Sequence, residues 1–334
     1  MFSRRTLSRA FFAAIIGAAV IPLGAGKLAA ADVEWKAYTY SPATAVAYQK
    51  MEEMVNAFEE QTSGRIEITL NAGGSLPIKG TNITQAIGDG ILDLAGDAFY
   101  AGNVSFGNIL FLPGLVQTSE ELDTAFDIIE PALEEEMSKL GVEVLGYYHY
   151  PLQVLWSISE LKSWQDLDGK KVRVTSPAQG EFVQNFGGIP VTLSSSEVAP
   201  ALQRGIIDVV ITAASAGAKR YQDSLKHGFL IGPNLHTSFI LANKASFDAL
   251  GAEDQQLLQE LATKAGQEIT AQLAVDEVEM TKMFEEEGIT TTAAKPSDSE
   301  ELVEAMSSYW DSWAESEGEK AVTAVNEIRK TLGR

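Results

Sequence analysis

Residues 169–213 constrain the fold more than any other part of the sequence, because strand and helix patterns alternate within them. Charged and β-branched residues alternate in Lys171–Thr175, which predicts a strand. A short run with a helical pattern follows in Gln179–Phe186. Two further β-branched runs, Ile189–Leu193 and Ile206–Thr212, predict a second and a third strand.

The segment between the second and third strands carries its own start and stop signals. Ser194 with Glu197 three residues later forms a capping box, which predicts the first turn of a helix. Gly205 is the residue type that commonly ends a helix. The whole segment is therefore predicted to be βαβαβ, the repeating unit of an α/β protein with largely parallel strands.

Arg173 lies inside the first of these strands. A guanidinium group is costly in a strand unless the strand end opens on a cleft where the charge meets an anion. The alternative is that a neighbouring carboxylate or backbone carbonyl groups satisfy the arginine. The chemistry of the side chain alone leaves both possibilities open.

The motif around this arginine resembles a known family. Five short segments occur in the same order as in that family: Thr62–Ile66, Gly90–Asp93, Phe111–Gly114, Lys171–Val174 and Ser196–Asp208. Together they resemble the extracytoplasmic solute-binding proteins of TRAP transporters, the DctP-like family. The resemblance extends over most of the chain after the first 31 residues.

This resemblance implies a fold, a partner and a role for one residue. The implied fold is α/β, a two-lobe periplasmic solute-binding protein with a long helix bridging both lobes. The implied partner is a TRAP-type membrane permease driven by the sodium gradient. In the resembled family, the arginine at the position of Arg173 pairs with a ligand carboxylate.

The N-terminus has the pattern of an export signal. Arg4, Arg5 and Arg9 precede an apolar run, Ala10–Gly26, and small residues end at Ala31. We expect residues 1–31 to be a signal peptide, removed on export to the periplasm. The twin-arginine and the general secretory routes both fit it.

Charge and cysteine content limit the possible partners. The formal net charge of −21 becomes −25 when the four positive charges of the signal are removed. Such a polyanion is not suited to nucleic acid, and it fits a marine or halophilic bacterium. The chain has no cysteine, which excludes disulfides and thiolate chemistry.

The sequence predicts two lobes, each formed by two segments. We expect lobe I to contain residues 32–153 and about 244–280, and lobe II residues 154–243 and about 281–334. A Pro-free run, Asp254–Glu287, is the predicted bridging helix. His236–Asn243 is predicted to be a late strand that returns the chain toward the first lobe.

Catalytic patterns are poorly represented. The three histidines, His149, His227 and His236, have no metal-ligand spacing, and no phosphate-binding or dinucleotide-binding loop is present. We therefore predict a binding protein and not an enzyme, with no cofactor and no bound metal. An exported enzyme is the lesser alternative. The protein is expected to be a monomer.

The candidate ligand-binding residues come from strand ends, where ligands bind in α/β proteins. Two departures from the family pattern shape the prediction. Thr212 replaces an asparagine that often contacts ligand, and Gln153 stands where many members carry a second arginine. The full candidate set is Arg173, Gln153, Trp156, Thr212, Tyr148, Tyr100, Tyr38 and His236.

One cationic anchor instead of two favours a small monocarboxylate, or a hydroxy or keto acid, over a dicarboxylate. The aromatic residues suggest a different ligand, a small amine or amino alcohol held in an aromatic box that includes Trp156. Arg173 would then be paired with a protein carboxylate. Both alternatives keep the same transport role.

Overall fold

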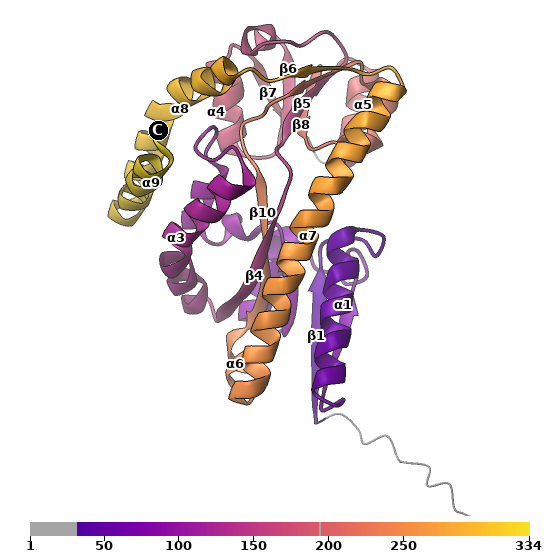
Figure 1. Cartoon of the computed structure of the whole chain (residues 1–334), viewed down its shortest axis with the longest axis vertical. Coiled ribbons are helices and arrows are strands. Elements are labelled where there is room, and N and C mark those ends of the chain that lie inside the picture. Colours follow the sequence, from indigo (N-terminus) through magenta and orange to yellow (C-terminus); the bar gives the residue numbers. More distant parts are fainter. Residues whose placement is uncertain (1–31, 194) are drawn as a thin grey trace, which may run out of the picture. The chain divides into compact units, whose positions relative to one another are not determined.

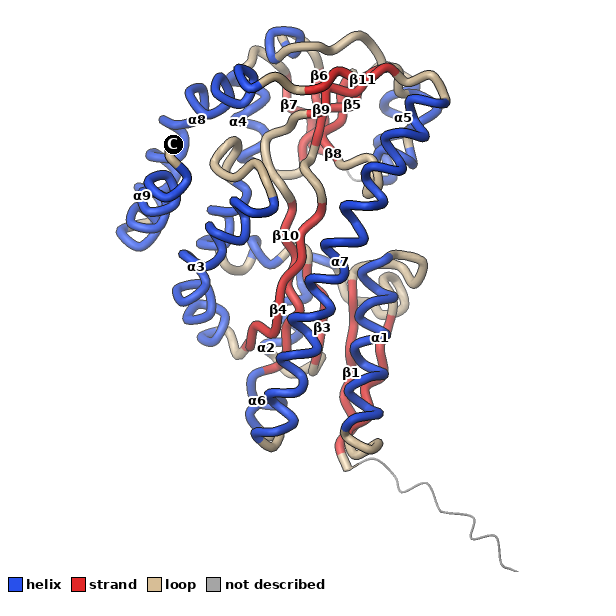
Figure 2. Tube along the Cα trace, in the orientation of Figure 1, coloured by secondary structure: helices blue, strands red, loops and turns tan. Residues whose placement is uncertain are grey.

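The computed structural model describes residues 32–193 and 195–334, so the predicted signal peptide and Ser194 of the predicted capping box lie outside the described residues. The elements fall around two β-sheets, which together give a mixed α/β fold (Figures 1 and 2). The α/β prediction is confirmed.

The first sheet has the strand order β2-β1-β3-β10-β4. Strand β1 is parallel to β2 and β3, whereas β10 runs antiparallel to β3 and β4. Its strands are β1 (Val33–Thr39), β2 (Ile66–Asn71), β3 (Leu94–Asp97), β4 (Val142–Tyr150) and β10 (His236–Asn243). The helices within this part of the chain are α1 (Val46–Gln61), α2 (Ile83–Gly88), α3 (Ser119–Lys139) and α6 (Lys244–Asp248).

The second sheet has the order β11-β9-β5-β8-β6-β7. Its strands are β5 (Val154–Ser157), β6 (Lys171–Val174), β7 (Ile189–Thr192), β8 (Val209–Thr212), β9 (His227–Leu230) and β11 (Thr290–Ala293). The helices α4 (Pro177–Asn185) and α5 (Ser195–Gln203) lie between its parallel strands in sequence. Six short 3-10 helices complete the connections: Gly80–Asn82, Tyr100–Gly102, Ser105–Phe111, Trp164–Leu167, Ala218–Arg220 and Gln222–Ser224.

The predicted βαβαβ unit is present, with small shifts at its ends. Helix α4 begins two residues earlier than predicted, because Ser176 accepts a hydrogen bond from the Gln179 backbone and Pro177 occupies the first helical position. Strand β8 begins at Val209 and not at Ile206, because Gly205 adopts a positive φ of 64° and the Ile206 amide still bonds back to the helix at Ala201.

The backbone crosses between the two sheets at three places. The β4–β5 and β9–β10 connections run side by side, since the Gln153 amide donates to the Asn234 carbonyl at 3.0 Å. The third crossing is α7 (Ala252–Glu286), a single helix of 35 residues. Its first part packs with the first sheet through Leu258, Ala262 and Ile269, and its last part packs with the second sheet through Phe284. The predicted bridging helix is confirmed.

Helix α7 approaches strand β4 so closely that only glycine fits. A Cβ atom on Gly266 would overlap the Tyr147 carbonyl oxygen, and one on Gly146 would lie 3.0 Å from the Ala262 carbonyl oxygen. A register shift between β4 and β10 at Leu145 releases the carbonyl group of that residue, which accepts a hydrogen bond from the Gln259 side chain at 2.7 Å. Backbone contact and hydrogen bonding together fix the helix on the first sheet.

Two parts of the predicted lobe boundaries are wrong. The predicted boundary places strand β10 in lobe II, with residues 154–243, but β10 pairs with β3 and β4 in the first sheet. This pairing agrees with the separate prediction that the strand returns the chain toward the first lobe. Helix α9 (Glu319–Leu332) was also assigned to lobe II, but it packs on α3, where Lys320 pairs with Glu135 at 2.7 Å. Helix α8 (Pro296–Glu317) does contact α4 of the second lobe.

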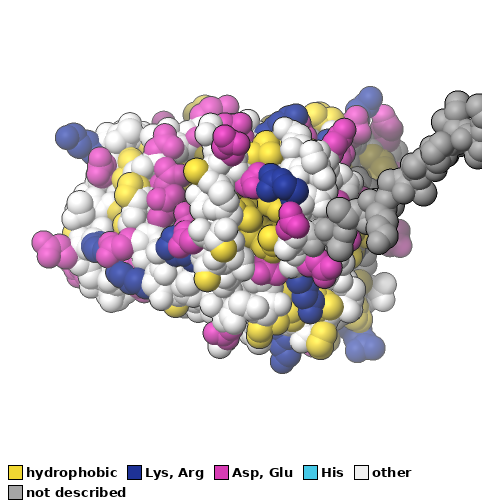
Figure 3. Space-filling view, turned by 90° about the horizontal axis from the view of Figure 1, so that it is seen from below, with side chains coloured by type: hydrophobic (Ala, Val, Ile, Leu, Met, Phe, Trp, Pro, Cys, Tyr) yellow, Lys and Arg dark blue, Asp and Glu magenta, His cyan; other side chains and the backbone are white. Residues whose placement is uncertain are grey.

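Acidic side chains are spread over the face of the molecule drawn in Figure 3, as the negative net charge predicts. Basic and apolar side chains are interspersed among them on that face. No helix in the described part of the chain combines the length and the apolar run that crossing a bilayer requires.

The contact between α7 and β4 gives a prediction about stability. Gly266→Ala should lower the free energy of unfolding by about 1–3 kcal/mol, because the new methyl group overlaps a backbone carbonyl that cannot move without shifting β4. Urea unfolding followed by far-UV circular dichroism would measure the change. Gly102→Ala is the control, since its Cβ would meet no atom within 4 Å. Equal stabilities of the two variants would contradict this account of the contact.

Candidate ligand-binding site

Arg173 lies in β6, between β7 and β8, at the end where the parallel strands of the second sheet terminate. Only 8% of the residue is exposed. Its Nε donates a hydrogen bond to the Leu193 carbonyl at 3.2 Å. Within the described residues this is the only hydrogen-bond acceptor of Arg173, so most of the five guanidinium N–H donors have no described partner.

The electrostatic surroundings of Arg173 are unusual for a buried cation. Burial lowers the pKa of Arg173, and the nearby hydroxyl groups of Tyr221 and Tyr40 act in the opposite direction. The ion pairs found in residues 32–193 and 195–334 do not include Arg173. An arginine in a protein stays charged, so the described part of the chain supplies no counterion for this group.

Aromatic side chains of the first lobe contact one another, and one of them, Tyr40, acts on the pKa of Arg173. Tyr40, which follows β1, is 44% exposed and meets the ring of Phe99 edge-on, with centroids 4.8 Å apart. Tyr150 lies with its ring centroid 5.8 Å from that of His236. Phe111 also stacks on the His236 ring, with centroids 5.3 Å apart. The first lobe therefore contributes an aromatic surface without a lysine or arginine among these residues.

His236 is part of this aromatic group and is uncharged at neutral pH. Burial among aromatic rings lowers the pKa of His236 to about 4, and a backbone hydrogen bond with Ala98 only partly opposes this shift. The imidazole therefore adds hydrogen-bonding capacity to the site, and no positive charge, above about pH 5.

Four aromatic candidates from the sequence are buried. Tyr100 and Trp156 have no exposed surface, and Tyr38 and Tyr148 are 2% exposed. Tyr100 packs edge-on against Phe239. The Tyr38 hydroxyl donates to the Ile78 carbonyl and accepts from the Gly74 amide, so it anchors the loop after β2.

Trp156 needs a correction, because its placement does not suit an exposed aromatic box. Its indole N–H donates to the Thr212 carbonyl at 3.1 Å, and its ring meets Phe284 of α7 edge-on. Both contacts are those of a core residue in the second lobe. The amine hypothesis loses its central residue in this arrangement.

Gln153 and Thr212 lie near the crossing strands and the end of β8. Gln153 is partly exposed, and its side-chain amide donates to the Pro151 carbonyl at 2.8 Å. Thr212 is 7% exposed and is the last residue of β8. Sequence reasoning did not select Tyr221 or the Leu193 carbonyl, although both lie close to Arg173, because neither belongs to a recognisable motif.

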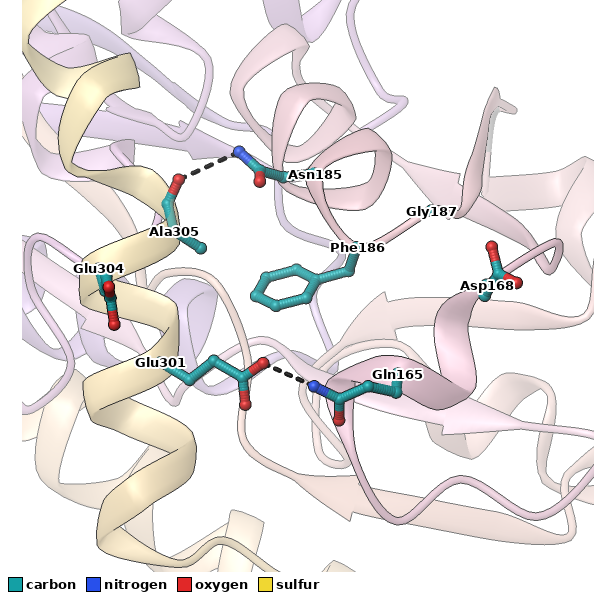
Figure 4. A pocket seen from close by; sticks show the side chains of 8 residues that line it. All are labelled: Gln165, Asp168, Asn185, Phe186, Gly187, Glu301, Glu304 and Ala305. Carbon is teal, nitrogen blue, oxygen red and sulfur yellow. Dashed lines mark hydrogen bonds between the residues drawn. The ribbon is translucent and has the colours of Figure 1, made fainter.

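Two cavities of the described residues lie elsewhere and do not include Arg173. One, of about 640 Å³, lies between α8 and the end of α4, with Phe186 and several carboxylates on its walls (Figure 4). The other, of about 350 Å³, is formed by α3, β4 and α7. The candidate site is therefore identified by the chemistry around Arg173 and not by the size of a cavity.

Comparison with known proteins places the chain in a family. The family described as "Bacterial extracellular solute-binding protein, family 7" (DctP) matches residues 37–317. The chain belongs to this family. Its curated relatives below are named as periplasmic binding proteins, and a solved structure similar to this chain is named as a TRAP solute-binding protein, which supports a role in transport and not in catalysis.

Curated relatives and solved structures agree with this assignment. The chain is 28% identical over 286 residues to the ectoine/5-hydroxyectoine-binding periplasmic protein UehA of Ruegeria pomeroyi, covering 81% of each chain. It is 30% identical over 200 residues to the ectoine-binding periplasmic protein TeaA of Halomonas elongata, covering 55% of this chain and 56% of that protein.

A solved structure supports the two-lobe fold. DctP6 of Bordetella pertussis, an extracytoplasmic solute receptor binding pyroglutamic acid, matches with a TM-score of 0.79 at 22% identity. The match covers 89% of this chain and 99% of that one. The predicted two-lobe periplasmic binding-protein fold is confirmed.

The lowered pKa of His236 gives a prediction about acid stability. The unfolded histidine has a pKa of about 6.5, so between pH 6.5 and 4 the unfolded chain takes up a proton that the folded chain does not. The stability due to neutral His236 is fully present above pH 6.5 and is lost as the pH falls toward 4. When the pH is lowered from 7.5 to 4.5, the free energy of unfolding of the wild type should fall by about 2 kcal/mol more than that of His236→Gln. Urea titrations at both pH values test this, and a pH-independent difference would contradict it.

Proposed function

We propose that this chain is the periplasmic solute receptor of a TRAP transporter that captures a small organic monocarboxylate, with Arg173 as the anchor of the ligand carboxylate. The observation that carries the proposal is the buried guanidinium group, which has no carboxylate partner among the residues that the structure describes. A ligand carboxylate would supply the missing charge and accept two parallel hydrogen bonds.

The aromatic residues of the first lobe favour a ligand with a single negative charge. The aromatic residues on the first-lobe side, Tyr40, Phe99, Tyr150 and His236, contribute no positive charge at neutral pH. They suit the apolar faces of a ring or a short chain. Ectoine and pyroglutamate, the ligands named for two relatives, are small rings that carry one carboxylate, which makes such compounds the first candidates.

The amine alternative is less well supported. A purely cationic ligand near Tyr40 would be repelled by Arg173, whose charge no carboxylate of the described residues compensates. A zwitterion would satisfy both groups, since its carboxylate can bind Arg173 while its cationic part lies against the exposed Tyr40 ring. The two ligand classes therefore differ in one group: acids and zwitterions contain a carboxylate that can bind Arg173, and simple amines do not.

Delivery follows from the two-lobe architecture. Contacts made by one ligand to both lobes select the closed form, which the membrane permease of a TRAP transporter would accept. Export by the N-terminal signal would place the mature protein, acting as a monomer, in the periplasm.

Arg173→Ala tests the anchor. If a thermal-shift screen with ectoine, pyroglutamate and hydroxy or keto acids identifies a ligand, calorimetry should show a dissociation constant about 10²–10⁴-fold higher for the variant. The reason is that a bound carboxylate would be buried without its partner. Arg173→Lys should recover only part of the loss, because an ammonium group cannot form the two-pronged contact.

Arg204→Ala is the matched control, since Arg204 is exposed at the end of the neighbouring helix. Its affinity should equal that of the wild type. Unchanged affinity of a folded Arg173→Ala protein would reject the carboxylate anchor, and preferential binding of amines without a carboxylate would favour the aromatic alternative.

A further inference from the structure

Glu277 of α7 holds the segment that follows β8. Its carboxylate accepts hydrogen bonds from the backbone amides of Ala214 and Ser215 at 2.7 and 2.8 Å. The Ser215 hydroxyl donates a third hydrogen bond to the same carboxylate at 2.7 Å. An ionised acceptor facing two adjacent N–H groups makes these bonds stronger than ordinary neutral ones.

These two amides are the unpaired donors at the start of a helical turn. The carbonyl groups of Ala213 and Ala214 accept hydrogen bonds from Gly217, Ala218 and Lys219, which gives the segment its helical turns. The N–H groups at the beginning of such a turn have no partner within it. Glu277 therefore acts as a capping residue supplied by a distant helix.

The capped segment, residues 213–221, ends beside the candidate anchor. The segment follows Thr212, the last residue of β8, and β8 pairs with β6 so that Val210 lies opposite Arg173. Tyr221, at the end of the segment, is 4% exposed, and its hydroxyl group acts to raise the pKa of Arg173. Arg220 similarly influences the pKa of Tyr150 of the first lobe. The segment packs tightly on β8, because a Cβ atom on Gly217 would overlap the Thr212 hydroxyl. A shift at Ala214 would therefore be transmitted to the residues around the ligand.

Helix α7 is fixed at its other end to the first lobe. Gly266 contacts the backbone of β4, and Ile269 is buried in the core of the first lobe. Phe284, after Glu277, packs on Trp156 in the second lobe. Glu277 is thus located where a helix anchored on both lobes makes a polar contact with the segment next to Arg173.

We infer that Glu277 is a positioning residue that couples the bridging helix to the ligand cleft, by holding residues 213–221 against the end of β8, the strand that pairs with β6 at Arg173. The coupling to ligand rests on the proposed function. Movement of α7 relative to either lobe changes the position of this segment, so that lobe closure and ligand retention depend on the same carboxylate.

Hydrogen–deuterium exchange of the ligand-free protein tests the positioning role without any ligand. Glu277→Ala should accelerate exchange in peptides covering residues 213–221 by at least about tenfold, because two charge-assisted backbone hydrogen bonds are lost. Glu277→Gln keeps one acceptor oxygen and should show a smaller increase. Glu279→Ala is the control, since Glu279 is an exposed glutamate on the same helix. Unchanged exchange in Glu277→Ala would overturn the inference.

Ligand dissociation tests the coupling. With ectoine and pyroglutamate as probes, stopped-flow displacement should show faster release from Glu277→Ala by about tenfold to a hundredfold, partial rescue in Glu277→Gln, and wild-type release from Glu279→Ala. Near-UV circular dichroism verifies that each variant is folded. Faster exchange with unchanged release would refute the coupling.

The proposed ligand class and the positioning role of Glu277 are tested by different measurements, so that either can be rejected without the other. If the wild type binds neither probe nor any carboxylate of the screen, the proposed ligand class is rejected. Hydrogen exchange of residues 213–221 still decides whether Glu277 positions the segment.

Discussion

The backbone contact between α7 and β4 is the constraint on which the arrangement of the two sheets depends. Gly146 and Gly266 allow the two backbones to approach to a distance that any side chain would prevent. The irregularity of β4 at Leu145 gives the helix a carbonyl group to bond. Because the same helix then reaches Phe284 in the second lobe, its position on the first sheet sets where the second lobe can lie.

Charge distribution explains how so acidic a chain can act as a receptor for acids. Its carboxylates are numerous and spread over the surface drawn in Figure 3, whereas Arg173 is buried and has no carboxylate partner among the described residues. Surface charges are screened by salt, but a buried charge is not. In the proposed function, a small anion would therefore gain more from the buried guanidinium of Arg173 than it would lose to the surrounding surface.

The sequence predicted a large part of this architecture for identifiable reasons. Alternating β-branched residues gave β6, β7 and β8, and the Pro-free run gave α7. It did not distinguish which aromatic residues are buried, because tyrosine and tryptophan occur both in cores and in binding sites. Trp156 and Tyr100 proved to be core residues, while Tyr221 carried no motif that could have selected it.

The alternation of residue types thus determined the predicted secondary structure. The motif around Arg173 determined the family resemblance and the choice of that residue as the anchor. Only the tertiary structure decided that β10 joins the first sheet, that α9 packs on α3, and that Glu277 caps the segment after β8. The physical reason is that each of these depends on groups distant in sequence. Strand pairing, helix packing and capping from another helix use ordinary residues whose partners become defined only when the chain is folded.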